Sequence, residues 1–180
     1  MSDQRYLPPQ ASVEAIAPSP ETPAHQAEPI DIGGWLILVA IGLIVTPFRV
    51  VHLMFNNHWP IFRDGHWDRL TNPDSPAYHV LWAPILTYEI VGNFFLMTLA
   101  GITLALFFKK SRKTPRFAII WYAFGPIFLL IDEVLGSFIP AVAAAPDASN
   151  LRELIRATII AAIWIPYFLL SKRVKQTFTR

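Results

Sequence analysis

Residues 161–180 read AAIWIPYFLLSKRVKQTFTR, an apolar run followed directly by a cluster of lysine and arginine. A helix that crosses a membrane often ends in this way, because cations remain at the membrane surface, where anionic lipid headgroups attract them. A proline, Pro166, lies inside the apolar run. Neighbouring helices can satisfy the carbonyl that such a proline leaves free, so a membrane bundle tolerates it. The stretch predicts an integral membrane protein.

The composition of the whole chain supports this interpretation. Of its 180 residues, 53% are hydrophobic and 16% are charged, whereas about 25% of the residues of a soluble domain are charged. The chain has no cysteine, which excludes disulfides, thiolate metal sites and thiol catalysis. Its basic residues lie mostly in two clusters rather than along one surface, so we expect no nucleic acid partner.

Four apolar segments are long enough to span a membrane, since a helix needs about 20 residues to cross the hydrocarbon layer. They cover about residues 32–55, 80–108, 117–139 and 151–170. None of them alternates with the period of two that a lipid-facing strand requires. We therefore predict an all-α fold, a bundle of four transmembrane helices over residues 32–170.

Two tails flank the predicted bundle. Residues 1–31 contain six prolines and five acidic residues against one arginine, a composition that buries too little apolar surface to offset the entropy of ordering. We predict a disordered tail there. We expect no cleaved signal peptide, because the basic start and apolar core of such a peptide are missing. Residues 171–180 are predicted to be a second, basic tail.

Basic residues are distributed unevenly among the predicted connections, and this predicts the orientation. Nine lie between the second and third helices or after the fourth: Lys109, Lys110, Arg112, Lys113, Arg116, Lys172, Arg173, Lys175 and Arg180. The other two connections contain only Arg63 and Arg69. Because basic loops stay on the cytoplasmic side, we predict that both termini are cytoplasmic. All nine except Arg180 are predicted to anchor the protein to anionic lipid at the inner surface.

Prolines lie inside three predicted helices, at Pro47, Pro126 and Pro166, and Pro84 lies near the start of the second helix. A proline removes one backbone donor and clashes with the preceding helical turn. We predict that the helices are kinked at these positions, as helices of ordinary membrane bundles also are.

Ionisable side chains occur inside all four predicted spans, in the half nearest the predicted outer surface. At 1.5 Å per residue they lie roughly 5–15 Å below the boundary. These groups, with one amide, are Arg49, Glu89, Asn93, Asp132, Glu133, Arg152 and Arg156. An isolated charge near the bilayer centre costs at least ~2.5–3.5 kcal/mol, so we expect these groups to face the bundle interior and pair. The predicted pairs are Glu89 with Arg49, and an acid of the third helix with an arginine of the fourth.

Two interpretations of this set remain open. A balanced set of acids and arginines fits a structural clamp that holds the helices together. The same groups also fit a polar cavity, open to the outside, that binds a small ligand or passes protons. His58, His66 and His79 show no recognised metal-ligand spacing. No phosphate-binding or nucleophile–base motif is present either, so we expect no metal, no cofactor and no enzymatic activity.

Three strings carry a resemblance to a known family: IGGWLILVAIGLIVTP at residues 32–47, YEIVGNFFL at 88–96 and LIRATIIAAIWIPYFLLSKRVKQTF at 154–178. In these strings the chain resembles the family called Domain of Unknown Function 2569. The resemblance implies a bacterial inner-membrane protein with four helices, and it implies no catalytic residues, because no activity is established for the family. The family's motif falls on Gly33, Gly34, Trp35, Glu89, Gly92, Asn93, Arg156, Trp164, Pro166, Tyr167, Arg173, Lys175 and Phe178.

From these observations we predict an integral membrane protein that acts as a non-enzymatic accessory or scaffold subunit. Its predicted partners are membrane lipid and either another membrane protein or further copies of the same chain. A small transport or proton-coupled component is the second interpretation, in which the charged groups serve a pathway. A membrane-embedded enzyme that acts on lipid is the third, and no nucleophile–base pattern supports it.

Overall fold

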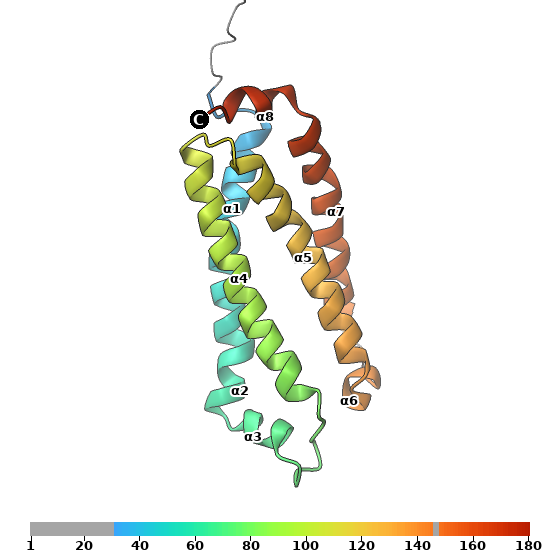
Figure 1. Ribbon diagram of the computed structural model, residues 1–180. Helices are drawn as coiled ribbons and strands as arrows, with labels where there is room; N and C mark the ends of the chain where they lie inside the picture. The colour runs from blue at the N-terminus through green and yellow to red at the C-terminus, as the bar shows by residue number, and fades with distance from the viewer. Residues whose placement is uncertain (1–30, 146–147) are drawn as a thin grey trace, which may run out of the picture.

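The computed structural model describes residues 31–145 and 148–180, and these residues form four long helices with short helices at their ends (Figure 1). The elements, in chain order, are α1 Trp35–Leu53, the π-helix η1 Met54–His58, α2 Trp59–Arg63, α3 His66–Thr71, α4 Trp82–Phe108, α5 Thr114–Ser137, α6 Pro140–Ala143, α7 Ala148–Leu170 and α8 Lys172–Thr177. The disordered tail predicted for residues 1–31 lies, apart from Asp31, outside the described residues.

Four helices are long and apolar enough to cross a membrane: 35–63, 82–108, 114–137 and 148–170. The predicted all-α bundle of four transmembrane helices is thereby confirmed. Many large apolar side chains on these helices are exposed, for example Phe48 at 73%. Such a surface is unstable in water and stable against acyl chains, so the outside of the bundle fits a lipid environment.

The first span is longer than predicted. The sequence places its end near residue 55, where polar residues begin, but the helix continues through η1 and α2 to Arg63. Trp59 N–H donates to the carbonyl of Met54, five residues earlier, so the backbone stays helical with one wider turn. The polar residues Asn56–His58 therefore lie on a helix rather than in a loop.

The two ends of the bundle differ in composition. The basic end contains the α4–α5 connection and residues 171–180, and the cavity end contains α2, α3 and α6. In Figure 1, α1 and α7 are near each other at the basic end and diverge towards the cavity end. α4 packs between α1 and α5, and α5 packs between α4 and α7. α1 and α7 are not among the closely packed helix pairs of the described residues.

Aromatic side chains pack the bundle at the basic end. The Trp164 ring of α7 lies 6.3 Å from the Trp35 ring of α1 and 6.0 Å from the Tyr122 ring of α5. Tyr122 also contacts Phe168, which is 3% exposed. Aromatic pairs at these separations add to the stability gained from burial. This cluster therefore joins three helices at the end where they converge.

Residues 171–180, predicted as a basic tail, fold back on the bundle. The Ser171 hydroxyl accepts a hydrogen bond from Val174 N–H and caps α8. The apolar side of α8 is buried at Val174 and Phe178, and the Phe178 ring lies 5.3 Å from that of Phe107 in α4. The carbonyl of Arg180 accepts a hydrogen bond from the backbone N–H of Arg112 at 2.6 Å.

Three of the cations predicted to anchor lipid also contact the chain itself. Lys110 pairs with Asp31 at 2.5 Å, and its ammonium holds the pKa of Asp31 below its usual range. That contact weakens as the pH falls through the pKa of Asp31. Arg112 donates to the carbonyl of Thr179 at 2.6 Å, and the Arg173 guanidinium lies against Gly33. The predicted role in lipid anchoring stays a prediction.

Pro84 lies in the first turn of α4. Three prolines lie further inside long helices, as the sequence indicates: Pro47 in α1, Pro126 in α5 and Pro166 in α7. Each interrupts the ladder of backbone hydrogen bonds at one position. The predicted kinks stay predictions, and the three helices continue on both sides of their prolines.

A candidate ligand cavity between the four long helices

A cavity of about 560 Å³ lies between the long helices, towards the cavity end. Ligand-binding cavities commonly measure about 300–1,000 Å³. Its polar and charged lining consists of Thr46, Arg49, Asn57, His58, Glu89, Asn93, Asp132, Glu133, Ser149, Asn150, Glu153 and Arg156. These side chains come from α1, η1, α4, α5 and α7, so every long helix contributes to the site.

Six of the seven residues selected from the sequence line this cavity: Arg49, Glu89, Asn93, Asp132, Glu133 and Arg156. The tertiary structure thus brings them together from four helices. Arg152 is the exception among them, because its side chain is exposed and donates to the carbonyl of Ala148 in its own helix.

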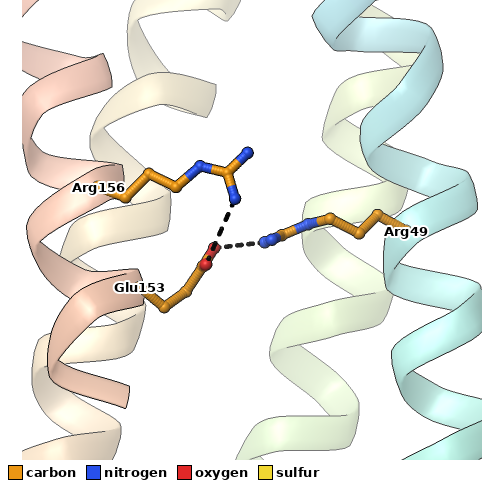
Figure 2. Close-up of polar contacts among 3 residues, drawn as sticks. All are labelled: Arg49, Glu153 and Arg156. Carbon is orange, nitrogen blue, oxygen red and sulfur yellow. Dashed lines mark hydrogen bonds and ion pairs between the residues drawn. The ribbon is translucent and has the colours of Figure 1, made fainter. Parts of the chain in front are cut away.

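The basic wall of the cavity is built from α1 and α7. Arg49 of α1 pairs with the Glu153 carboxylate of α7, and Arg156 lies 3.8 Å from the same carboxylate (Figure 2). Two guanidinium groups from opposite helices therefore converge on one anion. The Arg49 and Arg156 side chains are 51% and 63% exposed, so both face open space as well as their partner.

The acidic wall is built from η1, α4 and α5. His58 Nε2 lies 2.8 Å from Glu89 Oε2, and the His58 side chain is only 7% exposed. The Asp132 carboxyl interacts electrostatically with Glu89, Glu133 and His58. Two atoms here are buried without a hydrogen-bond partner within residues 31–145 and 148–180: His58 Nδ1 and Asp132 Oδ1.

The predicted pairs are wrong in their partners. Glu89 was predicted to pair with Arg49, but it pairs with His58. Arg49 and Arg156 pair instead with Glu153, an acid of the same helix as Arg156. No ion pair of the described residues joins an acid of α5 to an arginine of α7. Arg156 meets Glu153 because the two residues are three apart on the same helix face. The pairs Arg49–Glu153 and His58–Glu89 join different helices, so the packing of the helices sets them.

Among the residues that form ion pairs in this cavity, sequence reasoning missed two, Glu153 and His58. Glu153 lies within the fourth predicted span, so its depth alone was a signal that could have selected it. His58 lies beyond residue 55, where the sequence predicts that the first helix ends, so it falls in a predicted connection rather than in a span. The wider turn of η1 keeps His58 on the helix and places it against Glu89. A π-helical turn of this kind has no clear signal in a single sequence, although such turns often occur at functional sites.

The local geometry explains how α4 presents two polar groups. Glu89 and Asn93 are four residues apart and share one helix face. Asn93 Nδ2 donates to the carbonyl of Glu89 at 2.8 Å, which fixes its amide orientation and leaves the amide oxygen available as an acceptor. Gly92, the residue directly before Asn93, is where α4 closely approaches the Phe128 ring of α5.

The cavity thus has walls of opposite charge. Guanidinium groups donate several hydrogen bonds in a fixed plane and suit phosphate or carboxylate groups. Carboxylates and the free amide oxygen only accept hydrogen bonds, and they suit cations or N–H donors. Such a site can orient a small molecule that carries both kinds of group.

The comparisons with known proteins agree with this architecture. The chain is 29% identical over 157 residues to "Inner membrane protein YdgK" of Escherichia coli (strain K12), which covers 83% of this chain and 94% of that protein. No solved structure matches the chain significantly. Residues 29–179 match the family described as Protein of unknown function (DUF2569). This match includes all four long helices and every charged residue of the cavity, and the chain belongs to the DUF2569 family.

Proposed function

We propose that this protein is a non-enzymatic protein of the inner membrane that binds a small polar ligand in the cavity between α1, α4, α5 and α7. One observation carries the proposal: charged side chains of both signs, from four helices, line an open volume of about 560 Å³. The name of its relative, an inner membrane protein, supports the location.

The exposure of the charges favours a ligand site over a structural clamp. In a clamp, acids and arginines contact each other and exclude solvent, because pairing must offset the cost of desolvation. Arg49 and Arg156 are instead more than half exposed although both face Glu153. The two exposed guanidinium groups can therefore still donate hydrogen bonds to a ligand. The accessory role predicted from the sequence is compatible with such a site, and a partner protein remains a prediction.

A proton-coupled transport component is the second candidate function. The observation that favours it is the contact of His58 with Glu89, and the interaction of Glu89 with Asp132 on the neighbouring helix. Histidine and carboxyl groups in a row can pass protons through a membrane. If the protein transports a solute with protons, Glu89→Gln should abolish the dependence of the solute flux on the proton gradient in reconstituted vesicles.

Accessibility of the cavity tests the leading proposal. Because the chain has no cysteine, single cysteines can be introduced without a background. Ala157 lines the cavity, and Ala161 lies one turn further along α7 and is 6% exposed. We expect a small, water-soluble thiol reagent to label Ala157→Cys rapidly and Ala161→Cys slowly in nanodiscs. Equal, slow labelling of both variants would mean that the cavity is closed and would overturn the proposal.

A further inference from the structure

α1 and α7 both line the cavity, but they are not among the closely packed helix pairs of the described residues. α1 and α7 diverge towards the cavity end, where side chains rather than closely packed backbones bridge them (Figures 1 and 2). The Arg49–Glu153 contact forms this bridge. Apolar residues of both helices also line the cavity, Val45 on α1 and Ile160 on α7, and both are exposed. Residues that line the charged cavity are thus also exposed on the apolar outside of the bundle.

The basic wall has the donors that an anionic group needs. Arg49 and Arg156 approach one carboxylate, Glu153, from two helices. A phosphate group presents the same kind of acceptor oxygens to guanidinium groups as a carboxylate does. Glu153 thus occupies the position that the phosphate of a bound molecule would share or take over.

The acidic wall has the acceptors that a cation needs. Glu89 and Asp132 both line the cavity and interact with each other, so a negative charge on one disfavours a negative charge on the other. A bound ammonium would relieve this repulsion and would donate hydrogen bonds to the carboxylates and to the free amide oxygen of Asn93. An independent observation also indicates a missing partner here. His58 is buried, lines the cavity, and has no hydrogen-bond partner for Nδ1 within the part of the chain that the structure describes.

We propose that the cavity binds the zwitterionic headgroup of a phospholipid, with the phosphate at Arg49 and Arg156 and a primary ammonium at Glu89 and Asp132. This inference rests on the proposed function and names its ligand class. The acyl chains leave through the gap between α1 and α7 into the bilayer. A primary ammonium fits better than a quaternary one, because carboxylates bind N–H donors, whereas quaternary ammonium groups are usually held by cages of aromatic rings.

Lipid competition tests this assignment. The purified full-length protein is equilibrated in detergent with equal amounts of phosphatidylethanolamine, phosphatidylcholine and phosphatidylglycerol of identical acyl chains, and bound lipid is measured by native mass spectrometry. We expect phosphatidylethanolamine to be preferred over both others. Loss of one charge-assisted hydrogen bond corresponds to about tenfold in affinity. We therefore expect Arg156→Gln and Glu89→Gln each to weaken this binding by about tenfold or more.

Arg152→Gln is the matched control, because Arg152 is on the same helix as Arg156 but bonds to its own backbone. It should leave the preference unchanged. The Arg156 side chain is 63% exposed, so its replacement should not prevent folding. If Glu89→Gln fails to fold, Arg156→Gln alone still tests the assignment. Equal binding of phosphatidylglycerol and phosphatidylethanolamine, or an equal effect of Arg152→Gln, would overturn the assignment.

A soluble headgroup identifies the source of the ligand. If glycerophosphoethanolamine alone competes as well as the lipid does, the zwitterion class stands and the lipid source is wrong. If neither competes while Ala157→Cys is still labelled rapidly, the ligand class is wrong and the open cavity of the proposed function stands. If Ala157→Cys is not labelled, the proposed function itself fails.

Discussion

At the scale of single residues, Gly92 shows how one missing side chain lets two helices meet beside the cavity. A Cβ at this position would overlap the ring of Phe128 on α5. The same region is tightly connected, since the Tyr88 hydroxyl donates to the carbonyl of Phe128 at 3.0 Å and the two rings are 4.8 Å apart. The close approach of α4 and α5 at Gly92 therefore determines how near Glu89 of α4 lies to Asp132 of α5.

Gly92→Ala should lower the free energy of unfolding by about 1–3 kcal/mol, because the added methyl group forces α4 and α5 apart. Unfolding in mixed micelles, followed by thermal or detergent titration, measures the change. Gly101→Ala is the control on the same helix, since nothing lies within 4 Å of a Cβ there. Its effect should stay within about 1 kcal/mol and be neutral or favourable. Equal destabilisation by both substitutions would contradict the close approach at Gly92.

At the scale of elements, α8 is a short helix that depends on its contacts. Six residues cannot form a stable helix alone, because nucleation is costly. α8 is held by the Ser171 cap and by burial of Val174 and Phe178 against the basic end. Its cations, such as Lys175, are exposed on the other side. The arrangement gives a helix with one buried and one charged face, which suits the surface of a membrane.

Phe178→Ala should release α8 from the bundle, since a buried phenylalanine contributes about 3–5 kcal/mol relative to alanine. Hydrogen exchange of the α8 amides measures the release. We expect at least a tenfold increase in exchange rate, because each 1.4 kcal/mol corresponds to a factor of ten. Lys175→Ala, which removes an exposed side chain from the same helix, should leave exchange unchanged. Protection that survives in Phe178→Ala would mean that other contacts hold α8.

At the scale of the whole molecule, charge is distributed unevenly between the two ends. The nine cations of the predicted cytoplasmic side lie at the basic end, and the charged cavity lies towards the other. We propose that the basic end faces the cytoplasm, because positively charged connections are retained there. The cavity then opens towards the outer leaflet.

Reporter fusions test this orientation. Alkaline phosphatase is active only outside the cytoplasm, and green fluorescent protein exported in unfolded form does not fluoresce. After Arg180, the phosphatase fusion should be inactive and the fluorescent fusion bright. After Asp74, in the connection between α3 and α4, the results should be reversed. The opposite pattern at both sites would place the basic end outside.

Much of this architecture can be predicted from the sequence, because the free energy of placing a helix in a bilayer depends on the apolar residues of that helix alone. Crossing a bilayer requires a run of apolar residues, so the four spans and their connections follow from composition along the chain. The positions of Glu89 and Arg156 at similar depth follow from the constant rise of a helix. Six of the seven selected residues accordingly line one cavity.

The partners within that cavity were decided by the tertiary structure. Helical periodicity determines which residues share a face, but not how far each helix is rotated against its neighbours. The wide turn of η1 changes this rotation and brings His58 to Glu89, while Arg49 meets Glu153 across the gap between α1 and α7. The sequence by itself determined that charges would gather at one depth, because depth depends on position along a single helix. The packing of four helices decided which charges pair and that a cavity separates them, because both depend on distances between helices.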